Sequence, residues 1–98
     1  MSETENRLDG KVAIVTGAGR GIGRAIALAF TREGAAITCA ARTAEQVSST
    51  RSEIEKAGGR ALALPTDVTQ PDQVERMTNA TVDAFGGLDI LVVNAGVT

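Results

Sequence analysis

Short runs of apolar residues alternate along the chain with stretches whose apolar residues recur at helical spacing. The apolar runs, which predict strands, cover residues 12–16, 36–41, 60–64 and 88–93. The helices predicted between them run from 22 to 33, from the 43–46 segment to the Gly58-Gly59 pair, and from the 69–72 segment to Phe85. The strands are continuous apolar runs rather than alternating ones, so both of their faces should be covered, as in a parallel sheet with helices on each side. The pattern therefore predicts an α/β fold in the order βαβαβαβ with right-handed crossovers.

Local signals set the expected ends and buried faces of these helices. Gly34 should end the first helix, Thr43-Ala-Glu-Gln46 matches a capping box for the second, and Thr69-Gln-Pro-Asp72 is expected to cap the third. Helical spacing places on the buried face of the first helix Ile22, Ala25, Ile26, Ala29 and Phe30. The corresponding face of the third helix consists of Val74, Met77, Thr78, Thr81, Val82 and Phe85.

The size and charge of the chain restrict its possible partners. Its 98 residues are enough for one small domain or for part of a larger one. A net charge of -2 gives neither the basic footprint that nucleic acid requires nor a polybasic membrane patch. No apolar run approaches the roughly 20 residues of a membrane span. The polar opening lacks the apolar core of a signal peptide, and residues 1–8 are expected to form a disordered tail.

Several residue types are missing or rare, and their absence excludes some classes of metal site and catalytic site. The sequence has no His, Tyr or Trp, which excludes zinc sites built from His and Cys and nucleophilic triads built on His. A general acid or base would have to be Asp, Glu, Lys, Arg or Cys, or come from outside this chain. Cys39 is the only cysteine, so no internal disulfide can form, which fits a cytoplasmic location. Its position within a strand predicts buried packing.

A glycine-rich segment, Thr16-Gly-Ala-Gly-Arg-Gly-Ile-Gly23, joins the first strand to the first helix. Glycine allows a tight turn with positive φ, and its missing Cβ lets a pyrophosphate approach the main chain. The helix that follows presents N–H groups and a partial positive charge to an anion. The spacing is neither G-x-G-x-x-G nor that of a Walker loop. A glycine-rich turn without a ligand is the alternative, but four alternate glycines between an apolar strand and an amphipathic helix favour a phosphate site.

Three motifs in this order resemble the short-chain dehydrogenase/reductase family. T-G-x-x-x-G-x-G follows the first strand at 16–23, Asp67-Val68 follows the third strand, and Asn94-Ala-Gly96 follows the fourth. The likeness begins near Leu8 and continues to Thr98. It implies that residues 1–98 are the N-terminal part of a single NAD(P)-binding Rossmann domain, a doubly wound parallel sheet whose first four strands lie in the order 3-2-1-4. It also implies an oxidoreductase that moves a hydride between the cofactor and a carbonyl or alcohol substrate.

The resemblance assigns cofactor-binding roles beyond the carboxyl ends of the strands, where such sheets bind ligands. Asp67 would accept a hydrogen bond from the adenine amino group, and a turn residue ahead of a Thr69 cap is the alternative. Asn94 would tie strand ends together beside the cofactor, and Gly23 would allow close helix packing. The full set of expected cofactor-binding residues is Gly17, Gly19, Arg20, Gly21, Ile22, Arg42, Asp67, Val68, Asn94 and Gly96.

The end of the second strand predicts NADP(H) rather than NAD(H). NAD-selective Rossmann proteins carry an Asp or Glu about 20 residues past the glycines, where it binds the ribose hydroxyls. That place is Ala41 here, followed by Arg42, while the nearest acid, Glu45, falls inside the capping box. Arg42 can pair with a 2′-phosphate through its guanidinium fork, and Arg20 can approach from the other side. Two solvated surface arginines without a ligand are the alternative.

No catalytic residue is expected within this chain. Members of the resembled family carry a catalytic Ser, a Tyr and a Lys four residues on, in a later part of their length. This sequence has no Tyr, and its lysines, Lys11 and Lys56, lie outside any such motif. We therefore expect a truncated and, alone, inactive cofactor-binding half of a homo-oligomeric parent, with no metal, nucleic-acid or membrane partner. A nucleotide-binding module and a non-functional gene remnant are the alternatives.

Overall fold

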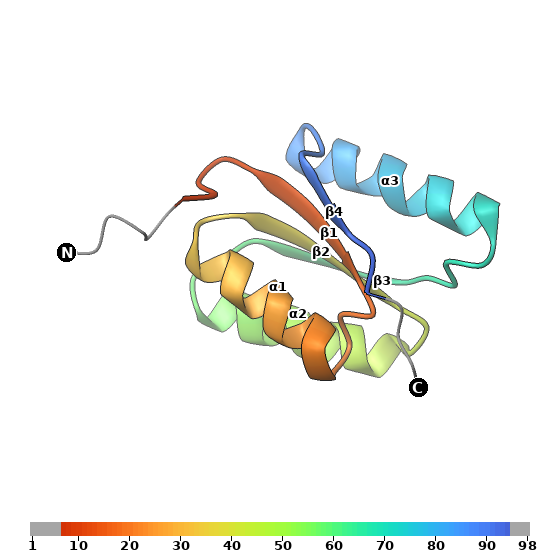
Figure 1. Cartoon of the computed structure of the whole chain (residues 1–98), viewed down its shortest axis with the longest axis horizontal. Helices are drawn as coiled ribbons and strands as arrows, with labels where there is room; N and C mark the ends of the chain where they lie inside the picture. Colours follow the sequence, from red (N-terminus) through yellow and green to blue (C-terminus); the bar gives the residue numbers. More distant parts are fainter. Residues whose placement is uncertain (1–6, 95–98) are drawn as a thin grey trace.

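The computed structural model describes residues 7–94, and these form a four-stranded parallel sheet with helices on both faces (Figure 1). The elements in chain order are β1 (Val12–Thr16), α1 (Gly21–Arg32), β2 (Ala36–Ala41), α2 (Ala44–Lys56), β3 (Ala61–Pro65), α3 (Pro71–Phe85) and β4 (Ile90–Val92). The strand order is β3-β2-β1-β4, and every neighbouring pair is parallel. The predicted βαβαβαβ order and the predicted strand order 3-2-1-4 are both confirmed.

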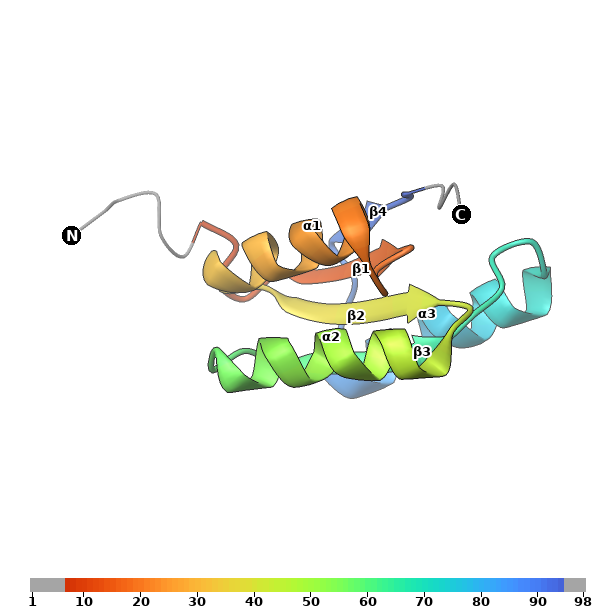
Figure 2. The ribbon, with the colours of Figure 1, turned by 90° about the horizontal axis from the view of Figure 1, so that it is seen from below.

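The sheet separates two layers of helices: α1 and α2 cover one face, and α3 covers the other (Figures 1 and 2). Because successive strand residues point to opposite faces, Val15 and Ile37 join the core cluster on the side of α1 and α2, whereas Ile14 packs with Met77 of α3. Every residue of β1, and all of β2 except Ala41, is buried. Cover on both faces is the physical reason for the continuous apolar runs in the sequence.

The buried face of α1 differs from the predicted one. The helix buries Gly23, Ala27 and Thr31. Ile22 and Ala25 were predicted on this face, yet Ile22 is 72% exposed and Ala25 is also exposed. The other predicted residues, Ile26, Ala29 and Phe30, are partly buried. A helix that lies close to a strand fills the interface with small side chains, so a prediction from larger apolar residues misplaces the face. In α3, Met77 and Thr81 are buried as predicted, but Val82 is 41% exposed.

The predicted side-chain caps of α2 and α3 are wrong, although both helices begin close to the predicted positions. Thr43 is the N-cap of α2, but its side chain makes no capping hydrogen bond. The N-cap of α3 is Gln70 rather than Thr69. The Thr69 hydroxyl donates instead to the Asp67 carboxylate, with an O–O distance of 2.6 Å. The hydroxyl that the sequence suggested for a helix therefore stabilises the turn before it.

The two ends of the described segment also differ from the sequence prediction. A disordered tail was predicted over residues 1–8, but Arg7 and Leu8 both make hydrogen bonds. The Arg7 N–H donates to the Glu33 carboxylate at 3.1 Å, the Leu8 N–H donates to the Glu33 carbonyl at 2.7 Å, and Leu8 packs against the core. Residues 1–6 and 95–98 lie outside the described residues. Strand β4, at one edge of the sheet, is shorter than the run predicted over residues 88–93. Within residues 7–94, no helix is long and apolar enough to cross a membrane.

Candidate functional site

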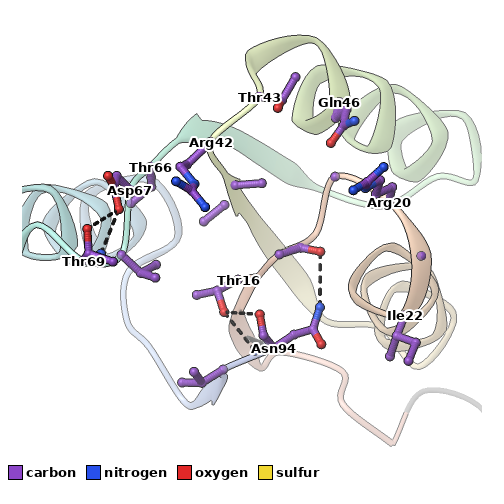
Figure 3. Close-up of a pocket in the computed structure, with 17 residues that line it drawn as sticks. Thr16, Arg20, Ile22, Arg42, Thr43, Gln46, Thr66, Asp67, Thr69 and Asn94 are labelled. Atoms are coloured by element: carbon purple, nitrogen blue, oxygen red, sulfur yellow. Dashed lines mark hydrogen bonds between the residues drawn. The ribbon is translucent and has the colours of Figure 1, made fainter. Parts of the chain in front are cut away.

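A pocket of about 700 Å³ lies beyond the carboxyl ends of the strands (Figure 3). Its walls come from the glycine-rich segment, the ends of β2 and β3, the start of α2 and the residues after β4. The predicted cofactor-binding residues that line it are Gly17, Gly19, Arg20, Gly21, Ile22, Arg42, Asp67, Val68 and Asn94. Gly96, the remaining predicted residue, lies outside the described part of the chain. Residues far apart in the sequence thus meet at one place, as the parallel sheet requires.

The glycine-rich segment packs too closely against its neighbours to carry side chains at Gly17, Gly19 and Gly23. Gly17 has a φ of +64°, and a Cβ there would lie 2.8 Å from the Asn94 carbonyl oxygen. A Cβ on Gly19 would lie 2.7 Å from the Cβ of Gln46. Gly21 has a φ of +61° and faces open space. The segment therefore presents bare backbone to the pocket, which allows a ligand to approach the main chain.

The N-terminus of α1 opens toward the same pocket. Arg20 is the N-cap in an extended conformation, and no side chain caps the helix there. The Arg24 N–H donates to the Arg20 carbonyl at 3.3 Å, so the N–H groups of residues 21–23 have no acceptor within the helix. Those N–H groups and the positive end of the helix dipole make this a site for an anion such as a phosphate.

Thr16 and Asn94 join the ends of β1 and β4 beside the pocket. The Asn94 backbone N–H donates to the Thr16 hydroxyl oxygen at 2.9 Å, and the Asn94 side-chain amide donates to the Gly17 carbonyl at 3.4 Å. The Thr16 hydroxyl in turn lies 3.3 Å from the Val92 carbonyl oxygen. Asn94 thus ties the strand ends together, in the position that the resemblance implied.

Asp67 is held in one orientation at the edge of the pocket. Its Oδ1 accepts hydrogen bonds from the backbone N–H of Thr69 at 2.9 Å and from the Thr69 hydroxyl at 2.6 Å. Its own N–H donates to the Gln73 side chain at 2.8 Å. The Thr69 hydroxyl, then the Thr69 N–H, and to a lesser extent the charge of Arg42, lower the pKa of Asp67 below its usual value. Asp67 is thus an ionised turn residue that also lines the pocket, so the two roles considered for it are compatible.

The charged side chains around the pocket favour an anionic ligand. Among its described lining residues, Arg20, Arg42 and Asp67 are the ionisable ones. Figure 3 shows Arg42 on the Asp67 side of the pocket and Arg20 on the side of α1. Both arginines are exposed, so their charges can reach a ligand. Glu45, in the first turn of α2, is not among the lining residues, and Ala41 brings no charge to the end of β2.

Eight pocket residues lie outside the predicted cofactor-binding set: Thr16, Ala40, Ala41, Thr43, Gln46, Thr66, Thr69 and Val93. The sequence pattern assigned Thr43 and Gln46 to a capping box of the second helix. It therefore gave no signal that they lie beside the pocket. Thr66 directly follows β3 and precedes Asp67. Its position at a strand end was the sequence signal that could have placed it in the site. Within residues 7–94, no group of three or more His, Cys, Asp or Glu side chains is placed to hold a metal ion.

The sequence and the fold both have well-defined relatives. Residues 11–98 match the family model described as short chain dehydrogenase, and the chain therefore belongs to the short-chain dehydrogenase family. Versicolorin reductase of Emericella nidulans is 46% identical over 99 residues, which cover 99% of this chain and 38% of that protein.

Solved structures agree with this assignment. A hydroxysteroid dehydrogenase from Escherichia coli superposes with a TM-score of 0.92 at 38% identity, over 97% of this chain and 40% of that one. A 7α-hydroxysteroid dehydrogenase complexed with NADH and 7-oxo glycochenodeoxycholic acid superposes with a TM-score of 0.87 at 35% identity, over 93% of this chain and 36% of that one. The chain thus spans about two fifths of the length of these relatives.

Proposed function

We propose that these residues form the cofactor-binding part of an oxidoreductase that transfers a hydride between NADP(H) and a carbonyl or alcohol substrate. Membership of an oxidoreductase family that binds NAD(P) supports the general activity. The choice of NADP(H) rests on one observation: Ala41 occupies the end of β2, and Arg42 and Arg20 line the same pocket.

Each part of NADP(H) has a chemically suitable counterpart in the pocket. The diphosphate suits the N–H groups at the start of α1 and the bare backbone of the glycine-rich segment. The adenine suits the carboxylate of Asp67, which can accept a hydrogen bond from its amino group, with Val68 beside it. Val68 is 49% exposed, so it is accessible to the ring. The 2′-phosphate suits the guanidinium of Arg42, with Arg20 available from the other side.

One relative was solved with NADH, so family membership does not by itself indicate the phosphorylated cofactor. The selection depends on the charge at the end of β2. A carboxylate there would repel a 2′-phosphate, and Ala41 does not. A hydrogen bond to a charged group contributes about 1.5–3 kcal/mol, so one productive arginine would favour NADPH by about 10- to 100-fold.

Turnover requires an acid or base at the substrate, a role that the family resemblance assigns to a Tyr. The sequence has no Tyr or His, and burial raises the pKa of the Cys39 thiol to about 12. We therefore propose that the 98 residues bind the cofactor and do not carry out hydride transfer alone. A nucleotide-binding module without turnover is the second candidate, and the absence of Tyr and His supports it.

The experiment is a pair of fluorescence titrations of the full-length polypeptide that carries these residues, one with NADPH and one with NADH. The proposal expects saturable binding of both, with the smaller dissociation constant for NADPH. Equal dissociation constants would contradict the proposed preference. Failure to bind either nucleotide would contradict nucleotide binding altogether.

A further inference from the structure

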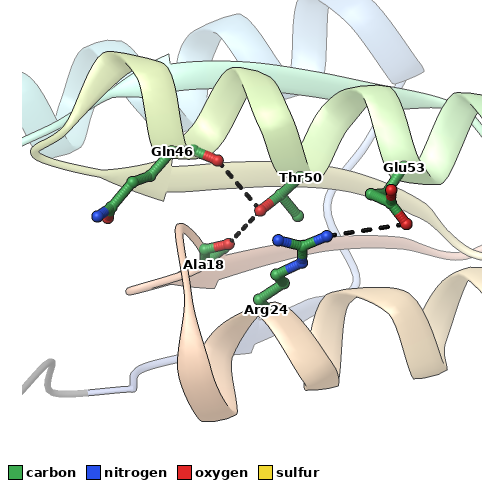
Figure 4. A network of polar contacts seen from close by, with 5 residues as sticks. All are labelled: Ala18, Arg24, Gln46, Thr50 and Glu53. Atoms are coloured by element: carbon green, nitrogen blue, oxygen red, sulfur yellow. Dashed lines mark hydrogen bonds and ion pairs between the residues drawn. The ribbon is translucent and has the colours of Figure 1, made fainter.

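Thr50, in the middle of α2, makes a hydrogen bond to the glycine-rich segment (Figure 4). Its side chain is fully buried. Its hydroxyl donates to the Ala18 carbonyl at 2.9 Å, and a longer contact of 3.2 Å reaches the Gln46 carbonyl in its own helix. The shorter contact crosses between elements, because Ala18 lies between β1 and α1.

This contact differs from those of Thr31 and Thr78, two other helical threonines. The hydroxyl of Thr31 donates to the Ala27 carbonyl at 2.9 Å, and that of Thr78 donates to the Val74 carbonyl at 3.0 Å. Threonine in a helix commonly donates such a hydrogen bond to the preceding turn, and the bond does not link the helix to another element. For Thr50 the contact within the helix is the longer one. Its hydroxyl is therefore placed to hold another part of the structure.

The backbone of Ala18 is held from both sides. Its N–H donates to the Ala40 carbonyl of β2 at 3.1 Å, and its carbonyl accepts from Thr50. Ala18 is fully buried, while Gly17 and Gly19 on either side of it line the pocket. Glycine has more backbone freedom than any other residue, and Ala18 has a glycine on each side. The two hydrogen bonds of Ala18 therefore restrict the conformation of residues 17–19.

The same helix also contributes Gln46 to the wall of the pocket. The side-chain oxygen of Gln46, in the first turn of α2, lies 2.8 Å from the place that a Cβ on Gly19 would occupy. Arg24 of α1 and Glu53 of α2 form an ion pair with an N–O distance of 3.7 Å (Figure 4). Exposed ion pairs of this kind contribute little. The buried Thr50 hydroxyl is therefore the stronger polar link between α2 and the segment.

We propose that Thr50 is a positioning residue for cofactor binding. Its hydroxyl fixes the Ala18 peptide, so that residues 17–19 keep the shape that receives the cofactor diphosphate before the cofactor arrives. Preorganisation of this kind lowers the cost of ordering a loop on binding. The inference rests on the proposed nucleotide-binding function, because it assigns to Thr50 a role in that same site.

The test compares Thr50→Val, which keeps the shape and removes the hydroxyl, with Thr50→Ser, which restores it, in the full-length polypeptide. NADPH is one probe, and 2′-AMP, which has no diphosphate, is the other. Thr50→Val should weaken NADPH binding by about tenfold and leave 2′-AMP binding unchanged, while Thr50→Ser should restore NADPH binding. The matched control is Thr81→Val, another fully buried threonine, whose hydroxyl lies 2.7 Å from that of Thr38 on the face covered by α3.

Thr81→Val should lower thermal stability without weakening NADPH binding. Unchanged NADPH binding in Thr50→Val, equal losses for NADPH and 2′-AMP, or an equal loss in Thr81→Val would each overturn the inference. Absence of binding in the unaltered protein would overturn the proposed function as well. If Thr50→Val does not fold, NMR of the unaltered protein decides. A slowly exchanging Thr50 hydroxyl proton close to Ala18 is expected, and rapid exchange of that proton while the Thr81 proton is protected would contradict the inference.

Discussion

Gly23, in the first turn of α1, lies directly against the backbone of Gly17, the residue that follows β1. A Cβ on Gly23 would overlap the carbonyl oxygen of Gly17 and would lie 2.8 Å from the side-chain nitrogen of Asn94. Gly23 is also buried, so an added methyl group has no open space to occupy. This contact brings the helix N-terminus to the pocket, and it agrees with the close packing that the family resemblance implied for Gly23.

Replacing Gly23 with Ala should destabilise the protein strongly. Alanine is favoured over glycine in a helix by about 1 kcal/mol, but overpacking of a tight interface costs about 1–3 kcal/mol, occasionally more. Since the overlap is with backbone, we expect Gly23→Ala to lower the free energy of unfolding by about 2 kcal/mol in urea denaturation of the full-length polypeptide. The control is Gly87→Ala, since a Cβ on Gly87 would meet no atom within 4 Å. A Gly23→Ala protein as stable as the control would contradict this packing.

Cys39 should resist alkylation in the folded protein. Its side chain is fully buried in β2, and burial raises the pKa of its thiol to about 12. At pH 8 the thiol is therefore neutral, and the thiolate is the reactive form. Peptide mass spectrometry after iodoacetamide treatment should find Cys39 unmodified in native buffer and modified in denaturant. Rapid native labelling at Cys39 would show that β2 is more accessible than described.

The isolated chain of 98 residues should show no dehydrogenase activity. It contains no Tyr or His, and loss of general acid–base catalysis alone costs about 10²–10⁴-fold in rate. The measurement is NADPH oxidation, followed by the absorbance of the reduced nicotinamide, with a panel of aldehydes and ketones. Turnover above the enzyme-free blank would contradict this prediction.

The same isolated chain should associate through the edge of β4. In the described residues β4 pairs only with β1, and Leu91 is 55% and Val93 70% exposed. An exposed, uncharged strand edge is a template for aggregation. Size-exclusion chromatography should show aggregates, and Val93→Lys should reduce them because edge charges oppose pairing. A sharp monomer peak with a cooperative melt in the unaltered chain would argue against this liability.

The fold was predictable because its signals are local. Continuous apolar runs, helical spacing and turn glycines gave the order of the elements, and the family resemblance gave the strand order. The buried face of α1 was misplaced because its contact with β1 uses small residues such as Gly23 and Ala27, which carry little weight in a hydrophobic pattern. The caps failed because a threonine hydroxyl has several nearby acceptors, and the sequence does not show which one it takes.

Most of the candidate site was predictable for a similar reason: its residues directly follow strands, and parallel strands end at one edge. The contribution of α2 was not predictable. The bond from Thr50 to Ala18 joins residues 32 positions apart, and Gln46 meets Gly19 across two elements. Such contacts depend on how α1 and α2 pack side by side, and no local motif encodes that packing.

We propose that Ala41 and Arg42 select NADP(H). The most direct measurement is the ratio of the NADH and NADPH dissociation constants for the unaltered full-length polypeptide and for Ala41→Asp, Ala41→Asn and Arg42→Ala. We expect the unaltered protein to prefer NADPH by about 10- to 100-fold, and the preference to shrink as salt rises because the arginines are exposed. Ala41→Asp and Arg42→Ala should each lose most of it, whereas the uncharged Ala41→Asn should retain it. Equal affinities in the unaltered protein, or an undiminished preference in both Ala41→Asp and Arg42→Ala, would show that these two residues do not select the cofactor.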